Sequence, residues 1–153
     1  MSINTKKSLQ IRQLAVEHLM LKLSTELRQR SKRHDVSSFT SDELPFLELY
    51  LDNYKNSEKG TDEHKELCMK LQPALVHHYA KNDHHPEHFD NGILSMNLVQ
   101  ITEMLCDWIV SAKEDNVSKT TFITMIITDY TEKYKLSNEL QSILVNTVDT
   151  LWD

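Results

Sequence analysis

Hydrophobic residues recur at helical spacing along most of the chain. The clearest stripe advances in steps of four, three, four and three residues, the spacing of one helical face: Leu94, Leu98, Ile101, Leu105 and Trp108. Similar patterns predict helices over residues 8–30, from residue 41, from residue 61, over 118–134 and over 136–152. The threonine and isoleucine content of 118–134 also allows a strand there. The sequence therefore predicts an all-α protein, a compact bundle of about six or seven helices. We expect one domain over residues 1–153, with the helices of 118–152 packing on the rest.

Composition narrows the class of protein. Hydrophobic residues make up 39% of the chain and charged residues 26%, a mixture typical of soluble globular proteins. Only two glycines are present, Gly60 and Gly92, which disfavours hairpins and glycine-rich phosphate loops. No apolar run is long enough to span a membrane. A net charge of −6 argues against a broad basic surface for nucleic acid.

Two further features bear on location. Residues 1–7 lack the apolar stretch of a secretory signal. Two cysteines, Cys68 and Cys106, are too few for a disulfide framework and lack the spacing of a thiolate zinc site. We therefore expect a cytoplasmic protein. The oligomeric state is left open.

Histidines and carboxylates provide the candidate chemistry, because both are ligands for divalent metal ions. Five of the eight histidines fall between positions 77 and 88. If the helix that starts near residue 61 continues through Pro73, His78 rather than His77 faces its inner side. The candidates that lie at a predicted helix end or on an apolar stripe are His18, His34, Asp35, His78, His84, His85 and Asp107. Glu87 and His88, in the polar loop that also contains His84 and His85, are further candidates.

Each candidate also has a simple structural explanation. His18 alone fits a core histidine, and the segment from His84 to His88 fits a solvated polar loop. Asp107 fits an exposed carboxylate one helical turn from Glu103. The density of histidines between predicted apolar helices favours a site over these separate explanations.

The order His, His-Asp, His, His-His, Asp over roughly residues 10–112 resembles the HD-domain superfamily of metal-dependent phosphohydrolases. Residues 84–92 are similar to the His-His-Glu-x-x-Asp-Gly stretch of its cyclic-dinucleotide phosphodiesterases, with an insertion. Residues 82–88 also resemble the Asn-x-His-His-Pro-Glu-His motif of an uncharacterised family of small bacterial and phage proteins. After the His-Asp pair, many HD enzymes have x-Gly-Lys, whereas this chain has Val36-Ser37-Ser38. The Gly-Tyr-Pro of the phosphodiesterases is also missing, so cyclic-dinucleotide specificity is not implied.

The resemblance implies one or two divalent ions, of Mn, Fe, Mg or Zn. The ligands would be His18, His34, Asp35 as the bridge, His78, His84 or His85, and Asp107. It also implies hydrolysis of a phosphomonoester or phosphodiester, with a nucleotide favoured, by a metal-activated water. Glu87, His88 or the remaining histidine of the 84–85 pair would transfer a proton to the leaving group.

Two alternatives remain open. One is an HD-type di-iron oxygenase. The other is a non-catalytic protein that binds a nucleotide or a partner and uses the metal structurally. The absent lysine favours the second alternative, whereas an open metal site would argue against it.

One geometric condition follows from the spacing of His18 and His34. Sixteen residues of straight helix would separate them by about 24 Å, too far to share a pair of ions about 4 Å apart. The chain must therefore turn between them, and Ser24 or Ser31 could cap a new helix there.

Overall fold

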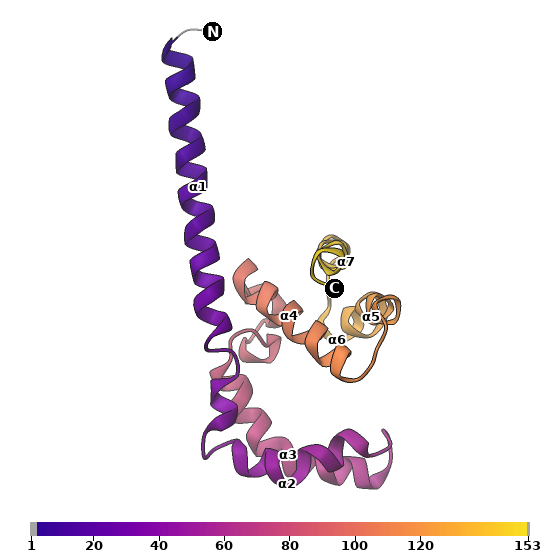
Figure 1. Ribbon diagram of the computed structural model, residues 1–153. Coiled ribbons are helices and arrows are strands. Elements are labelled where there is room, and N and C mark those ends of the chain that lie inside the picture. The colour runs from indigo at the N-terminus through magenta and orange to yellow at the C-terminus, as the bar shows by residue number, and fades with distance from the viewer. Residues whose placement is uncertain (1–2, 153) are drawn as a thin grey trace. The chain divides into compact units, whose positions relative to one another are not determined.

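The computed structural model describes residues 3–152, which form helices joined by turns and loops and contain no strand (Figure 1). The α-helices are α1 (Ile3–Ser31), α2 (Leu44–Asn56), α3 (Asp62–Lys81), α4 (Leu98–Glu114), α5 (Lys119–Met125), α6 (Thr131–Tyr134) and α7 (Asn138–Leu151). Three short 3-10 helices are η1 (Val36–Phe39), η2 (Pro86–His88) and η3 (Gly92–Ser95). A π-helical segment, η4 (Ile126–Tyr130), joins α5 to α6. The predicted all-α class is confirmed.

No described helix is both long enough and apolar enough to cross a membrane.

Residues 119–134 form a continuous helical stretch and not the strand that their composition allowed. Ser118 caps its start, because its hydroxyl accepts a hydrogen bond from the Thr121 N–H at 3.2 Å. The hydroxyls of Thr124 and Thr128 donate to carbonyls four residues earlier, an arrangement in which threonine is tolerated inside helices. Phe122 and Ile126 are fully buried. Tertiary burial thus outweighs the β propensity of this segment.

The described residues divide into two compact units, one ending at His34 and the other beginning at Asp35. The first unit consists of α1 and the turn that follows it. Helix α1 contains neither glycine nor proline, so nothing in its sequence interrupts it, and it continues through Ser24 as far as Ser31. The turn expected between His18 and His34 therefore comes only after Ser31.

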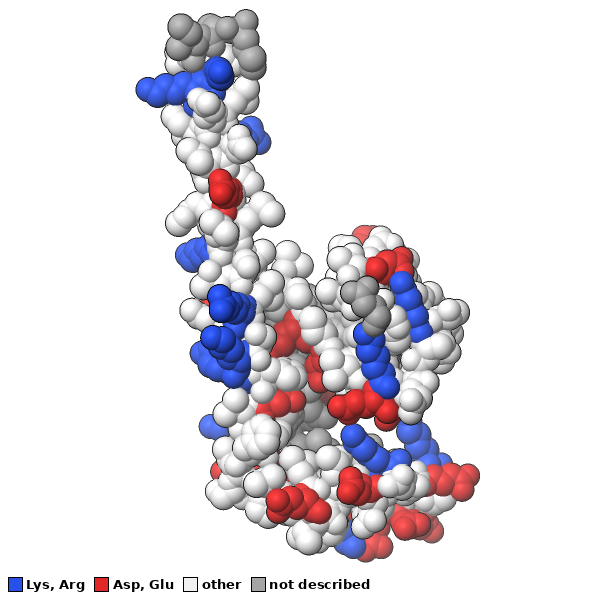
Figure 2. Space-filling model, in the orientation of Figure 1, with Lys and Arg blue, Asp and Glu red and all other residues white. Residues whose placement is uncertain are grey.

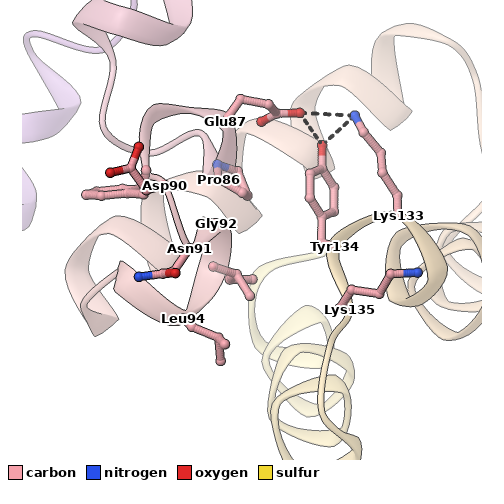
Figure 3. Close-up of a pocket in the computed structure, with 11 residues that line it drawn as sticks. Pro86, Glu87, Asp90, Asn91, Gly92, Leu94, Lys133, Tyr134 and Lys135 are labelled. Atoms are coloured by element: carbon pink, nitrogen blue, oxygen red, sulfur yellow. Dashed lines mark hydrogen bonds and ion pairs between the residues drawn. The ribbon is translucent and has the colours of Figure 1, made fainter.

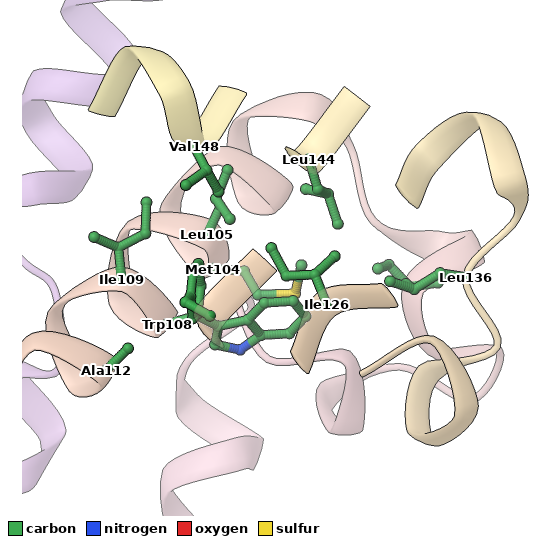
Figure 4. Packing of buried hydrophobic residues seen from close by; sticks show 11 residues of the cluster. Met104, Leu105, Trp108, Ile109, Ala112, Ile126, Leu136, Leu144 and Val148 are labelled. Atoms are coloured by element: carbon green, nitrogen blue, oxygen red, sulfur yellow. The ribbon is translucent and has the colours of Figure 1, made fainter. Parts of the chain in front are cut away.

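The core of the second unit is built by α4, α5, η4 and α7 (Figure 4). Its fully buried members are Met104, Leu105, Phe122, Ile126, Leu144 and Val148. The Trp108 ring packs against Tyr130 and Tyr134, with ring centroids 4.3 and 5.3 Å away. The C-terminal helices thus bury the apolar face of α4, and this core supports the segments that carry the candidate site.

The stripe predicted on α4 begins later than its spacing suggested. Asn97 caps the helix in a capping box with Gln100, so α4 starts only at Leu98. Leu94 lies in the separate 3-10 helix η3 and is 86% exposed, and Leu98 is 74% exposed. A helical stripe holds only while the helix is continuous, and the cap at Asn97 ends that continuity.

Helices α2 and α3 pack against each other and carry one side of the candidate site. Helix α3 continues through Pro73, so Leu67, Leu71 and Ala74 share a buried face. The same face leads to His78 in the last turn. On the face of the second unit visible in Figure 2, acidic and basic side chains are interspersed.

Candidate metal centre

Four side chains from three nearby segments of the second unit converge at one point. Asp35 precedes η1, His78 lies in the last turn of α3, and His84 and His85 follow in the next loop. Each offers one ligand atom, and these atoms all lie within 4.8 Å of one another. The Nε2 atoms of His78 and His85 are 2.9 Å apart. Asp35 Oδ1 lies 3.4 Å from the Nε2 atoms of both His78 and His84.

These separations fit ligands around a single divalent ion. At metal–ligand bonds of about 2.1 Å, neighbouring ligand atoms are about 3.0 Å apart at right angles and about 3.4 Å apart in a tetrahedron. Asp35 Oδ1 and His84 Nε2 are also shielded from solvent. Imidazole nitrogens with a carboxylate oxygen suit Zn, Mn or Fe. The donor set and its spacing therefore fit the expected class of ion.

A buried carboxylate orients His78. Glu43 is 1% exposed, and its Oε2 lies 2.9 Å from His78 Nδ1, while its Oε1 lies 2.7 Å from His77 Nδ1. A carboxylate can only accept, so each Nδ1 carries the proton and donates it. This tautomer leaves the lone pair of His78 Nε2 facing the other ligand atoms. A carboxylate behind a ligating histidine is the usual outer support of a metal site.

The pKa of Glu43 reflects this network. Burial alone would raise the pKa of the carboxyl, but hydrogen bonds from the η1 serines, His77 and His78 outweigh burial and hold the pKa below its usual value. Glu43 is therefore an ionised acceptor at neutral pH. Its role is not apparent from the sequence, because Ser41-Asp42-Glu43 indicates only a helix start.

His84 has a corresponding carboxylate behind it. Its Nδ1 lies 3.5 Å from Oε1 of Glu103, whose side chain is 11% exposed. The sequence motifs do not predict Glu103 as a site residue. The available signal was its position one helical turn before Asp107, which places two acidic groups on the same side of α4. Two histidines thus share one arrangement, with Nε2 toward the centre and Nδ1 toward a carboxylate.

The backbone at Asp35 helps to aim its carboxylate. Asp35 has φ 51°, in the left-handed region that aspartate tolerates better than most residues. Ser37 and Ser38, which follow Asp35 in η1, lie beside the histidines, with their hydroxyl oxygens 3.5 and 3.4 Å from His78 Nδ1. The Ser38 hydroxyl donates to Glu43 Oε2 at 3.1 Å, and Asn82 Nδ2 donates to Ser37 Oγ at 2.7 Å. These serines therefore support the histidine network.

Asp107 comes close to the cluster. One of its carboxylate oxygens lies within 4.8 Å of a ligand atom of Asp35. Asp107 is half-buried on α4. Two carboxylates this close repel each other unless a proton or a cation lies near them. This pair extends the candidate site toward α4.

The comparisons with known proteins give a family but no activity. A family of unknown function, DUF5662, matches residues 1–150. The chain belongs to the DUF5662 family. The match includes both units and every residue of the cluster. No curated protein and no solved structure matches the chain.

Two of the predicted ligands of this DUF5662 chain lie in the first unit. About 20 Å of continuous helix separates His18 from Ser31, at about 1.5 Å per residue. His18 and His34 therefore cannot bind the same pair of ions while α1 keeps this helix, and the condition set by their spacing is not met. His34 is the last residue of the first unit and directly precedes Asp35 in the sequence. Its role as a metal ligand stays a prediction.

Among residues 3–152, the groups of side chains placed to hold a metal ion include neither Glu87 nor His88. Pro86 is buried and opens the short helix η2, which carries the next two side chains elsewhere. His88 Nδ1 donates to the Tyr79 carbonyl oxygen at 2.8 Å, and Glu87 pairs with Lys133 at 3.3 Å. Their placement does not support the predicted proton transfer. His77 also lies beside the cluster, held by Glu43.

Proposed function

We propose that this protein is a metal-dependent phosphohydrolase that acts on a small phosphomonoester or phosphodiester. The observation that carries the proposal is the convergence of Asp35, His78, His84 and His85 at ligand spacing, with carboxylates behind two of the histidines. The order of these residues resembles that of HD phosphohydrolases, which favours a phosphate ester as substrate. A nucleotide is the favoured ester, on that resemblance alone.

The charges around the cluster support a bound cation. Glu43 and Glu103 are nearly buried, and Asp35 and Asp107 lie close together. Burying several carboxylates together is costly unless positive charge compensates them. A bound divalent ion would supply that charge, lower the pKa of a coordinated water and neutralise a phosphoryl oxygen.

The exposure of the ligands supports catalysis over a purely structural metal. The Asp35 side chain is 31% exposed and that of His78 is 14% exposed. Structural metal sites are closed, whereas catalytic sites keep a position open to solvent. In the proposal, Asp35 and the histidines hold the ion, and the exposed side of Asp35 admits the phosphoryl group.

The first experiment combines metal analysis with a hydrolysis screen. Protein as purified is analysed for Zn, Mn, Fe and Mg, and then assayed on p-nitrophenyl phosphate, bis-p-nitrophenyl phosphate and a panel of nucleotides. Asp35→Asn should lose both metal and turnover, whereas Asp52→Asn, at an exposed position on α2, should keep both. Turnover that persists in metal-free protein or in Asp35→Asn would overturn the proposal.

The same preparation separates the alternatives. Iron as the main metal, with a mixed-valence signal and oxygen uptake, would identify an oxygenase. Tight binding of a nucleotide, with no turnover in the presence of Zn, Mn, Fe or Mg, would identify a non-catalytic binding protein. We also place the protein in the cytoplasm, which accords with its two free cysteines, Cys68 and Cys106.

A further inference from the structure

The second unit has a cavity that the metal cluster does not use. It has a volume of about 550 Å³ and lies between residues 86–94 and residues 133–135 (Figure 3). Cavities of about 300–1,000 Å³ hold small organic ligands. The cavity is formed by the loop that follows the ligand pair His84-His85 and by the end of α6.

One wall of the cavity carries a fixed set of hydrogen-bonding groups. Lys133 Nζ lies 3.3 Å from Glu87 Oε1 and donates to the Tyr134 hydroxyl at 2.7 Å. The Tyr134 hydroxyl donates in turn to Glu87 Oε1 at 3.4 Å. Figure 3 shows the three groups meeting at one edge of the cavity. The wall therefore presents a carboxylate acceptor beside an ammonium donor, with their charges balanced.

Burial keeps the phenol of this wall neutral. It raises the pKa of Tyr134, and the charge of Glu87 raises it further. The hydroxyl thus remains a donor throughout the neutral range. A wall with fixed donors and acceptors and little net charge favours an uncharged polar ligand over a free anion.

Apolar groups line other parts of the cavity. Leu94 is 86% exposed although it is a large hydrophobic residue, and Figure 3 shows it well apart from the Glu87 group. Phe89 is half-buried and Ile93 is buried. A flat ring that contacts Leu94 would cover apolar surface while its edge met the polar wall.

The cavity lies next to the candidate metal centre in the sequence, and Tyr79 packs on the histidines of that centre. The Tyr79 ring centroid lies 5.0 Å from that of His85 and 6.1 Å from that of His78. Tyr79 thus contacts the histidines, and the cavity lining begins at Pro86, directly after His85. A ligand in the cavity would be a near neighbour of the metal centre.

We propose that this cavity binds the flat, hydrogen-bonding ring of the substrate, a nucleobase or a similar heterocycle, while its phosphoryl group lies at the metal centre. The position of the phosphoryl group rests on the proposed function, whereas the binding of the ring in the cavity does not. Glu87 accepts from ring N–H groups, Lys133 donates to ring acceptors, and Leu94 covers one face of the ring.

The test uses probes without phosphate, so that binding in the cavity is measured separately from binding at the metal centre. Adenosine, guanosine, cytidine and uridine are titrated, up to about 5 mM, into the full-length protein by calorimetry and saturation-transfer NMR. At least one should bind. Glu87→Gln should lower the affinity for that nucleoside about tenfold, because a charged acceptor is lost. Leu94→Ala should lower it about threefold, because an apolar contact is lost.

Matched controls lie outside the cavity. Glu114→Gln, at an exposed ion pair with Lys55, and Leu98→Ala, at an exposed leucine, should leave the affinity unchanged. Asp35→Asn should also leave nucleoside binding unchanged, since it alters only the metal centre. Failure of all four nucleosides to bind would overturn the inference, as would unchanged affinity in both cavity variants.

The outcomes also distinguish the two proposals. Nucleoside binding that depends on Glu87 and Leu94, without turnover of any ester, would support the cavity and refute the hydrolase. Turnover that depends on Asp35, with the same KM in both cavity variants, would support the hydrolase and refute the cavity.

Discussion

Replacing Glu43 with glutamine tests whether this buried carboxylate sets the tautomer of His78. Glutamine has nearly the same shape, but its amide presents N–H donors as well as a carbonyl oxygen. If the amide N–H faces His78 Nδ1, that nitrogen must accept, and the imidazole proton moves to Nε2. A protonated Nε2 cannot bind a metal ion. The substitution therefore damages the site without removing a ligand.

The magnitude follows from the contacts of Glu43. Loss of an outer carboxylate behind a ligating histidine lowers metal affinity about 10- to 100-fold, or about 1.4–2.7 kcal/mol. Glu43 also accepts hydrogen bonds from His77 at 2.7 Å and from Ser38 at 3.1 Å while 1% exposed. Weakening this network should lower the free energy of unfolding by about 2 kcal/mol. For a chain of this length, that lowers Tm by about 4–8 °C.

Zinc affinity is measured by competition with a chelating dye, and Tm by circular dichroism. Glu48→Gln is the matched control, since Glu48 is exposed on α2, the helix that follows Glu43, and it should change neither quantity. If Glu43→Gln lowers Tm but binds zinc as tightly as the wild type, the carboxylate stabilises the fold without orienting His78. That result would refute the reasoning.

Three further outcomes are expected. Asp35→Asn, which suits the left-handed backbone better than alanine, should lower zinc affinity about 100-fold or more; full zinc content by elemental analysis would contradict its role as a ligand. Zinc at about 100 times its Kd should raise the free energy of unfolding by about 2.7 kcal/mol in urea titrations, EDTA should reverse the effect, and an equal gain in Asp35→Asn would place the ion elsewhere. Phe122→Ala should cost about 3–5 kcal/mol in the same assay, because the ring is fully buried, and a loss below about 1 kcal/mol would contradict the packing of the core.

Much of the helical fold could be predicted from the spacing of apolar residues. Leu105 and Trp108 lie on the inward face of α4 as their spacing predicts, and α3 keeps its stripe through Pro73. The errors occur where local signals compete. Leu94 shares the spacing of the stripe but lies before the cap at Asn97, so it is exposed. Periodicity does not show where a helix begins when a capping residue such as Asn97 interrupts the stripe.

The candidate site could be predicted only in part. Residue type and order predict Asp35, His78, His84 and His85 as ligands, and the structure brings these four side chains together. Ligand type alone does not predict Glu43, whose contribution depends on a contact between the residue that precedes α2 and the last turn of α3. The same limit applies to Glu87 and His88, which share the motif of the ligands. The short helix that begins at Pro86 directs their side chains away from the ligand cluster, and residue types alone do not show in which direction a side chain points.

The sequence by itself determined the helical class and the ligand types, because both depend on residue identity and local spacing. Scarce glycine, helical periodicity and a dense group of histidines are all properties of the chain before it folds. Tertiary structure alone decided which nitrogen of each histidine faces the centre and which carboxylate lies behind it. These choices depend on contacts between residues 19 to 49 positions apart in the sequence, such as His84 with Glu103 and Asp35 with His84. Only the packing of one helix on another fixes contacts at that separation.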